Sequence, residues 1–198
     1  MATEFEAKVL LTAEEFVEIL TKHDSYMMPK IIKEDSYWSK YSSSKEAIKN
    51  NESLTRIRGE NGHYFLTLKK KYKDEAFEDN KEFETRIEKP EVIKKLLMES
   101  GYKCVFKKYK TGWKLPDYHE IAVNGVDVHI ELEIVENIKD KNCKNYKCYY
   151  ALEIECIPHE STTVFTNDYL SALIKNAFAI FNKTEKDFET RSWQELLA

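Results

Sequence analysis

The sequence lacks several features that mark common classes of protein. Its 198 residues contain no apolar run near the ~20 residues that a membrane-spanning helix needs. A secretory leader is not expected either, because Met1–Lys8 is already charged and alternating. No segment is of low complexity, and no repeat with a period of about 20–50 residues is present. We therefore expect a single cytosolic domain over residues 1–198 that does not enter a membrane.

Zinc-type cysteines and an excess of basic charge are missing as well. The four cysteines have neither metal-ligand spacing nor a secretory context, so we expect reduced thiols at Cys104, Cys143, Cys148 and Cys156. The formal net charge is −4, from 31 basic and 35 acidic residues, which disfavours a general nucleic-acid binder.

Arginine is scarce, and its placement draws attention. Only four of the basic residues are Arg, namely Arg56, Arg58, Arg86 and Arg191. Two of them, Arg56 and Arg58, stand two positions apart. The planar guanidinium group suits phosphate in a way that the Lys ammonium does not, so this pair raises the question of an anion site.

Alternation of apolar and polar residues with a period of two dominates the chain and predicts strands. The alternating runs are Glu4–Leu10, Ser53–Arg58, His63–Lys71, Lys81–Glu88, Tyr102–Lys110, Tyr118–Val123, Val126–Val135 and Tyr149–Ile157. A short further strand is expected at Tyr37–Tyr41. The turn dipeptides Asn61-Gly62 and Asn124-Gly125 each predict a tight antiparallel hairpin.

Helices are predicted between and after these strands. Thr12 and Glu15 form the pattern of a capping box at the start of one helix. A second helix is framed by Pro90 at its start and Gly101 just past its end.

The tail of the chain, from about Asp168 to Leu197, predicts two more helices. The second of these is expected to be capped by Thr184 and to carry Phe188, Trp193 and Leu196. Mostly antiparallel strands with a few helices indicate an α+β fold, or a barrel with helices packed outside.

Charged residues share one face of each predicted strand, because residues two apart on a strand lie on the same side. These sets are Glu4, Glu6 and Lys8; Arg56 and Arg58; Lys69 and Lys71; Glu82, Glu84, Arg86 and Glu88; His129, Glu131 and Glu133; and Glu153 and Glu155. They could be solvated faces of an ordinary sheet, but neighbouring like charges repel, so a solvated face usually mixes signs. If the sheet closes into a barrel, charges segregated inside it are costly unless they hold a ligand. A polyanion with divalent cations fits, since carboxylates bind metal while Arg and Lys bind phosphate.

At these residues the sequence resembles the CYTH, or triphosphate tunnel metalloenzyme, superfamily. Glu4-Phe5-Glu6-Ala7-Lys8 fits the Glu-x-Glu-x-Lys opening of that family. Further similar segments follow in the family's order over nearly the whole chain, at Leu54–Arg58, Phe65–Lys69, Lys81–Thr85, Pro90–Tyr102, Val105–Leu115, Ile130–Glu133, Leu152–Glu155 and Arg191–Leu197. One such motif is a weak signal, whereas this ordered set is a strong one.

The resemblance implies a closed eight-stranded antiparallel tunnel that binds a triphosphate and either Mg²⁺ or Mn²⁺. The barrel would span about residues 1–158, and C-terminal helices would span about residues 166–198. The implied metal ligands are Glu4, Glu6, Glu153 and Glu155. Implied catalytic roles fall on Glu4, Glu6, Glu84 and Glu133, the last at a position where the family usually has Asp. The implied phosphate-binding residues are Lys8, Arg56, Arg58, Lys69, Lys71, Lys108 and Lys110.

Two departures from the family's pattern bear on these roles. The strand Val105–Lys110 lacks the family's usual Arg, so Lys108 or Lys110 is expected to replace it, with the register left open. A longer loop at Ile138–Tyr149 replaces a family segment before the late acidic pair. The late metal pair is therefore either Glu131/Glu133 or Glu153/Glu155, and the second is preferred because it stands last.

The favoured activity is metal-dependent hydrolysis of inorganic tripolyphosphate or of a small organic triphosphate such as thiamine triphosphate. A class IV adenylyl cyclase, which makes cAMP and pyrophosphate from ATP, would use the same tunnel. Base stacking in that case could fall to Tyr37, Trp38, Tyr64 or Trp113, although core packing explains these residues better.

Further alternatives are an RNA 5′-triphosphatase, with Lys69–Lys73 guiding the RNA end, and a non-catalytic polyphosphate or nucleotide-binding module. His129 is expected to be a hydrogen-bonded residue of the barrel rather than a catalytic one. The tail helices could pack on the barrel, close one mouth or form a homodimer.

Overall fold

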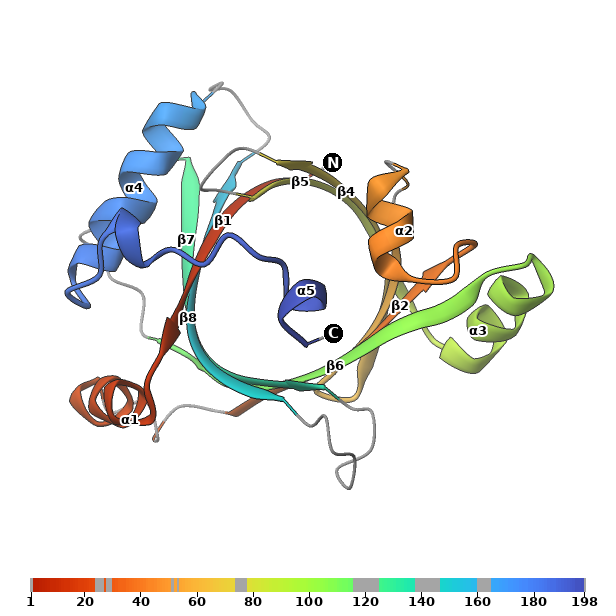
Figure 1. Ribbon diagram of the computed structural model, residues 1–198, viewed down its shortest axis with the longest axis horizontal. Coiled ribbons are helices and arrows are strands. Elements are labelled where there is room, and N and C mark those ends of the chain that lie inside the picture. The colour runs from red at the N-terminus through yellow and green to blue at the C-terminus, as the bar shows by residue number, and fades with distance from the viewer. Residues whose placement is uncertain are drawn as a thin grey trace.

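Eight antiparallel strands form a closed barrel in the computed structural model, which describes residues 2–23, 27, 30–50, 52, 54–73, 78–115, 125–137, 147–159 and 165–197. The strands are β1 Ala2–Leu11, β2 Lys30–Ser39, β3 Leu54–Glu60, β4 His63–Lys73, β5 Glu78–Ile87, β6 Lys103–Lys114, β7 Val126–Asn137 and β8 Cys148–Pro158. Their order around the barrel is β1-β5-β4-β3-β2-β6-β7-β8, and Figure 1 views the barrel along its axis. The predicted eight-stranded barrel is confirmed.

The helices are α1 Ala13–Lys22, α2 Ser44–Lys49, α3 Pro90–Glu99, α4 Asn167–Ala179 and α5 Trp193–Leu197. The predicted capping box is present at α1, where Thr12 and Glu15 exchange hydrogen bonds. The hairpin between β3 and β4 is also present, and both of its turn residues, Asn61 and Gly62, have positive φ. Within the described residues, no helix is long and apolar enough to cross a membrane.

The main hydrophobic core lies outside the barrel wall. Alternate residues of β1, including Phe5 and Val9, point outward and pack with β7 and β8 against α1 and α4. Phe16 of α1 and Phe178 of α4 are buried in this layer. Figure 1 shows α4 alongside β1 and β7. Because apolar residues occupy the outer face of these strands, their charged residues are turned toward the barrel axis.

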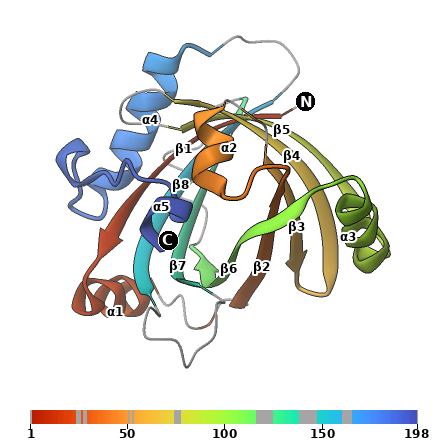
Figure 2. The same cartoon turned by 45° about the vertical axis from the view of Figure 1, so that its right-hand side comes forward.

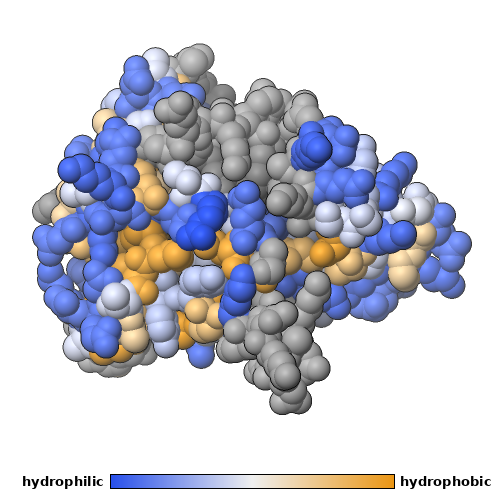
Figure 3. Space-filling view, in the orientation of Figure 1, coloured by the Kyte–Doolittle hydropathy of each residue, from blue (hydrophilic) through white to orange (hydrophobic). Residues whose placement is uncertain are grey.

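A second apolar cluster closes one mouth of the barrel. Leu196 and Leu197 of α5 are buried with Ala47 of α2, and with Phe106 and Ala151 from the inner faces of β6 and β8. Figure 2 shows α5 beside α2 at this end, and Figure 3 shows apolar side chains gathered toward the centre of the same face. The C-terminal helix therefore lies in the barrel mouth.

Two predicted elements need correction, and one helix was not predicted. The expected strand Tyr37–Tyr41 is the end of a longer strand, β2, which begins at Lys30. Its first half was missed because its buried positions carry the charges of Lys33 and Asp35. Helix α2 was not predicted; the Ser43 hydroxyl accepts a hydrogen bond from the backbone N–H of Glu46 near its start.

The second predicted tail helix is also wrong. Thr184 caps only a single 3-10 turn, Glu185–Asp187. Phe188 then leaves the turn in an extended conformation and forms an isolated β-bridge with Val9 of β1. Its ring lies 4.8 Å from that of Phe178, centroid to centroid. Packing of Phe188 against the barrel wall therefore ends the helical turn at this point. The predicted strand Tyr118–Val123 lies outside the described residues, and so does Asn124 of the predicted turn Asn124-Gly125.

Candidate functional site

The interior of the barrel is charged, and the strand register sets which charges meet. Lys8 of β1 lies opposite Glu153 of β8, which lies opposite Glu131 of β7. One row further along, Glu6 lies opposite Glu155. Directly opposed residues in a sheet point to the same face, so each row gathers its side chains on the inner side.

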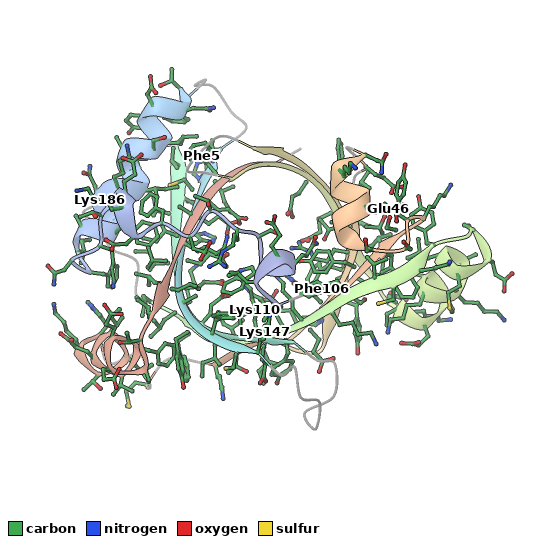
Figure 4. All side chains as sticks on the ribbon, in the orientation of Figure 1. Phe5, Glu46, Phe106, Lys110, Lys147 and Lys186 are labelled. Carbon is green, nitrogen blue, oxygen red and sulfur yellow. The ribbon has the colours of Figure 1, made fainter. Side chains whose placement is uncertain are left out.

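Three carboxylates on β7 and β8 form a cluster that we call the acidic wall, namely Glu131, Glu133 and Glu153. One oxygen from each lies within 4.8 Å of the others. Lys33 of β2 contacts both oxygens of Glu131, at 2.9 and 2.6 Å. Lys110 of β6 lies 2.6 Å from Glu133 Oε2 and also donates a hydrogen bond to Glu153 Oε2. Figure 4 shows Lys110 inside the ring of strands.

Burial and the neighbouring charges act unequally on the carboxylates of the acidic wall. Burial raises the pKa of Glu133 well above its usual value; Lys110 opposes this shift and the neighbouring carboxylates reinforce it. Burial also disfavours the charged form of Glu131, but the charge of Lys33 overcomes it and lowers the pKa of Glu131 to about 2. The cluster therefore favours the capture of a proton or of a cation.

A glycine on the neighbouring strand makes room for this cluster. Gly112 of β6 lies opposite Glu133 in the register. A Cβ atom at Gly112 would stand 2.8 Å from the carbonyl oxygen of Leu132 and 3.2 Å from Cγ of Glu133. A larger residue would push Glu133 away, so the glycine keeps the carboxylate in place.

Three cations on β3 and β6 form a second group that we call the basic wall, namely Arg56, Arg58 and Lys108. All three face the interior. Nη2 of Arg56 donates to Thr67, Glu82 and Glu84 at 3.2, 3.1 and 3.3 Å. Its Nε is buried and has no hydrogen-bond partner among the described residues. A buried donor left unsatisfied is costly, so this nitrogen favours an acceptor beside it.

The other two cations of the basic wall share one buried carboxylate, Asp35 of β2. Arg58 donates from Nε and Nη2 to the two oxygens of Asp35, at 2.8 and 3.0 Å. Nζ of Lys108 lies 3.5 Å from Oδ2 of the same residue. Burial opposes ionisation of Asp35, yet Arg58 and Lys108 hold its pKa well below the usual value. Sequence reasoning missed Asp35, although the alternation of Lys33, Asp35 and Tyr37 was a signal.

Strand β6 carries Lys108 of the basic wall and also Lys110, which contacts the acidic wall. The register of this strand, which the sequence left open, places both Lys108 and Lys110 on the inner face. Lys108 lies opposite Asp35, and Lys110 lies opposite Lys33. Burial lowers the pKa of Lys108 to about 7, and the charge of Lys110 adds to this effect. The same strand thus carries one lysine held charged by carboxylates and one that titrates near neutrality.

Helix α5 reaches the acidic wall from the barrel mouth. The indole N–H of Trp193 donates to Glu153 Oε1 at 3.2 Å. The Nζ atoms of Lys8 and Lys110 lie 5.8 and 5.7 Å from the centre of the Trp193 ring system. The carbonyl of Leu196 accepts hydrogen bonds from Lys147 and from the Tyr149 hydroxyl. This end of the chain is therefore anchored beside the charged interior.

The remaining predicted site residues are less closely gathered. The side chains of Glu4, Lys69 and Lys71 lie outside the described part of the structure. Glu84 reaches Arg56, but 41% of its side chain is exposed. Glu155 is partly buried and is not in the group of three carboxylates. The acidic wall therefore contains both members of the alternative pair Glu131/Glu133, but only Glu153 of the preferred pair Glu153/Glu155.

The predicted stacking residues mostly pack against the protein itself. Tyr37 contacts Phe106 with ring centroids 5.7 Å apart, and Trp113 contacts Phe16 at 6.0 Å. Trp38 donates its indole N–H to Ser36. Tyr64 is exposed on the barrel. His129 lies opposite Glu155 in the register and is partly buried.

Residues 2–186 match the sequence profile of the CYTH domain, so the chain belongs to the CYTH family. It is similar over 98% of its length to the PH1819 protein of Pyrococcus horikoshii, with 27% identity, 97% of that chain covered and a TM-score of 0.66. A conserved hypothetical protein of Pyrococcus furiosus shares 21% identity, with 98% of this chain and 99% of that chain covered and a TM-score of 0.66.

Structures with described activities are more distant. A putative adenylyl cyclase of Hippeastrum, HpAC1, described as having a dominant triphosphatase activity, shares 14% identity at a TM-score of 0.56, with 97% of this chain and 91% of that chain covered. At this identity the likeness shows the fold alone. No curated protein matches the sequence.

Proposed function

We propose that this protein hydrolyses a small triphosphate, such as inorganic tripolyphosphate or thiamine triphosphate, with the help of a divalent metal. The observation that supports this most is the separation of charge inside one closed barrel. A carboxylate cluster lies on β7 and β8, and a cation cluster lies on β3 and β6. A metal-complexed polyphosphate carries both charges that these two walls are suited to hold.

The donor set of the acidic wall fits a hard divalent cation. Its ligands are all carboxylate oxygens, which Mg²⁺ and Mn²⁺ prefer. Glu131, Glu133 and Glu153 would hold the ion; of the other predicted ligands, Glu155 is on β8 with Glu153, and Glu4 and Glu6 are on the adjoining strand β1. A cation held there supplies positive charge to phosphate oxygens and lowers the pKa of water.

The basic wall would bind the phosphate chain and stabilise the charge that develops on it. Phosphoryl transfer depends mainly on positioning and on cations near the phosphoryl oxygens. The unpartnered Nε of Arg56 supports such a role, as does the inward placement of Arg58, Lys108 and Lys8. A covalent route through Cys156 is not supported, because Cys156 is buried in the outer core and burial raises its pKa to about 12.

Product analysis tests this proposal. The protein would be incubated with tripolyphosphate, thiamine triphosphate and ATP in turn, with Mg²⁺ or Mn²⁺, and the products separated by anion-exchange chromatography. We expect orthophosphate and a diphosphate product, lost in Glu133→Gln and kept in the exposed control Glu34→Gln. Cyclic AMP with pyrophosphate would instead indicate a cyclase, and metal-independent binding without product would indicate a binding module.

A further inference from the structure

We propose that Asp35 is a positioning residue that fixes Arg58 and Lys108 for phosphate, an inference that rests on the proposed triphosphate site. Asp35 lies on β2, between β3 with Arg58 and β6 with Lys108. It is opposite both cations in the register, and its side chain is fully buried. One carboxylate therefore sets the positions of two of the three members of the basic wall.

The geometry of the Arg58 pair determines which donors remain for a ligand. A guanidinium group has five N–H donors in a fixed plane. Asp35 takes one from Nε and one from Nη2 in a bidentate contact. The two donors of Nη1 and the second of Nη2 are left, and their direction is fixed because the fork cannot rotate while both contacts hold.

The same carboxylate reduces the repulsion inside the basic wall. Arg56, Arg58 and Lys108 are gathered in a low-dielectric interior, where like charges repel strongly. Lys110 adds a further positive charge beside Lys108. Asp35 contacts two of these cations, so it allows them to stand close together before any substrate enters. This is the arrangement that a phosphate chain needs in order to meet several cations at once.

Stability alone does not account for a buried carboxylate at this position. A buried ion pair often contributes little net stability, since desolvation offsets the attraction between its partners. The position of this carboxylate instead lets it orient Arg58 and Lys108 of the basic wall. Its effect should therefore be found in turnover, through Arg58, more than in folding.

A double-mutant comparison of Asp35→Asn and Arg58→Lys tests this role, with tripolyphosphate as the probe. Turnover by each variant would be measured beside metal-free tripolyphosphate binding by calorimetry and thermal unfolding. We expect Asp35→Asn to lower kcat on the order of tenfold or more, as small displacements of catalytic groups do. Binding should change less than about threefold, because Arg56, Arg58 and Lys108 all remain in the Asp35→Asn protein.

The decisive comparison is additivity. If Asp35 acts partly through Arg58, Asp35→Asn should lower kcat less in the Arg58→Lys protein than in the wild type, with Lys108 accounting for the remaining loss. A purely structural role predicts independent, additive losses that follow the unfolding temperature. Glu34→Gln, on the outer face of the same strand, is the matched control and should leave kcat unchanged. Additive losses, or an Asp35→Asn protein with wild-type kcat, would overturn the inference.

Two further results separate the possible failures. If Asp35→Asn does not fold, Asp35→Glu keeps the charge but displaces the carboxylate, and wild-type kcat in that variant would contradict positioning. A wild-type protein that neither binds nor hydrolyses any triphosphate would overturn the proposed function and this inference together. An active wild type with an equally active Asp35 variant would overturn the inference alone.

Discussion

The two walls of the barrel use buried charge in opposite ways. In the acidic wall, three carboxylates share Lys33 and Lys110, and burial with like-charge repulsion raises the pKa of Glu133. In the basic wall, Arg58 and Lys108 share the single carboxylate of Asp35. Burying a charge is costly, so a fold that gathers carboxylates and cations side by side is suited to a ligand that supplies a cation and an anion together.

The largest expected effect comes from breaking the acidic wall. Glu153→Gln removes one of its three carboxylates, and we expect triphosphate hydrolysis to fall by at least ~10²-fold, as when other groups that stabilise the transition state are lost. Phosphate release would be measured with and without a chelator. Chelation should abolish activity in the wild type, and excess Mg²⁺ should restore it. Activity that survives chelation would contradict a metal at this wall.

A second way to disturb the same wall leaves its charges unchanged. Gly112→Ala places a Cβ within 2.8 Å of the Leu132 carbonyl oxygen, so β6 and β7 must shift and Glu133 with them. We expect a loss of about 1–3 kcal/mol in the free energy of unfolding. Gly59→Ala is the matched control, since its Cβ would meet the movable ring of Tyr64 at 3.1 Å. Equal losses in urea denaturation would contradict the crowding at Gly112.

The basic wall should show its own dependence on pH. Burial and Lys110 lower the pKa of Lys108 to about 7, so the free protein loses this positive charge as the pH rises through neutrality. The KM for tripolyphosphate should therefore rise above pH 7, by up to about tenfold per pH unit. In Lys108→Arg the cation stays charged and the rise should flatten. An unchanged profile in that variant would show that another group titrates.

The smallest effect is on stability, where the walls should respond to pH in opposite directions. The pKa of Asp35 is depressed in the folded state, so its contribution is present above its usual value of 3.8 and lost as the pH falls below it. The pKa of Glu133 is raised, so its contribution is present below 4.5 and lost as the pH rises toward the folded value. In metal-free thermal unfolding, Asp35→Asn should weaken the loss of stability as the pH falls below 3.8, and Glu133→Gln should weaken the loss as the pH rises above 4.5. The reverse would contradict the assignment.

Local sequence signals predicted the barrel well, because its strands alternate between an apolar outer face and a charged inner face. Arg56, Arg58, Glu133 and Glu153 could be singled out since like charges two apart stand out on a strand. Asp35 has no like charge two positions away, so only the weaker alternation of Lys33, Asp35 and Tyr37 marked it, and its pairing with Arg58 joins residues distant in sequence. Which late acidic residues come together depends on the register of β7 and β8, which the alternation alone does not set.

The position of the C-terminal helix could not be predicted from local sequence patterns either. Trp193 lies at helical spacing in the sequence, but it contacts Glu153 because the whole tail crosses the barrel mouth. The role of each site residue, the cytosolic location and the homodimer stay predictions. The fold and the membership of the CYTH family are established by the barrel topology and by the match over residues 2–186.

The closure of the barrel also constrains how the molecule is made. β1 is synthesised first, yet its pairing with β8 joins residues from opposite ends of the chain, such as Glu6 and Glu155. Contacts this distant in sequence slow folding, because the intervening chain must be ordered before they form. Until β8 has left the ribosome, one edge of β1 has no strand to pair with, and such an edge invites pairing with other chains. The protein should therefore depend on rapid completion of synthesis, or on a chaperone that shields its first strand.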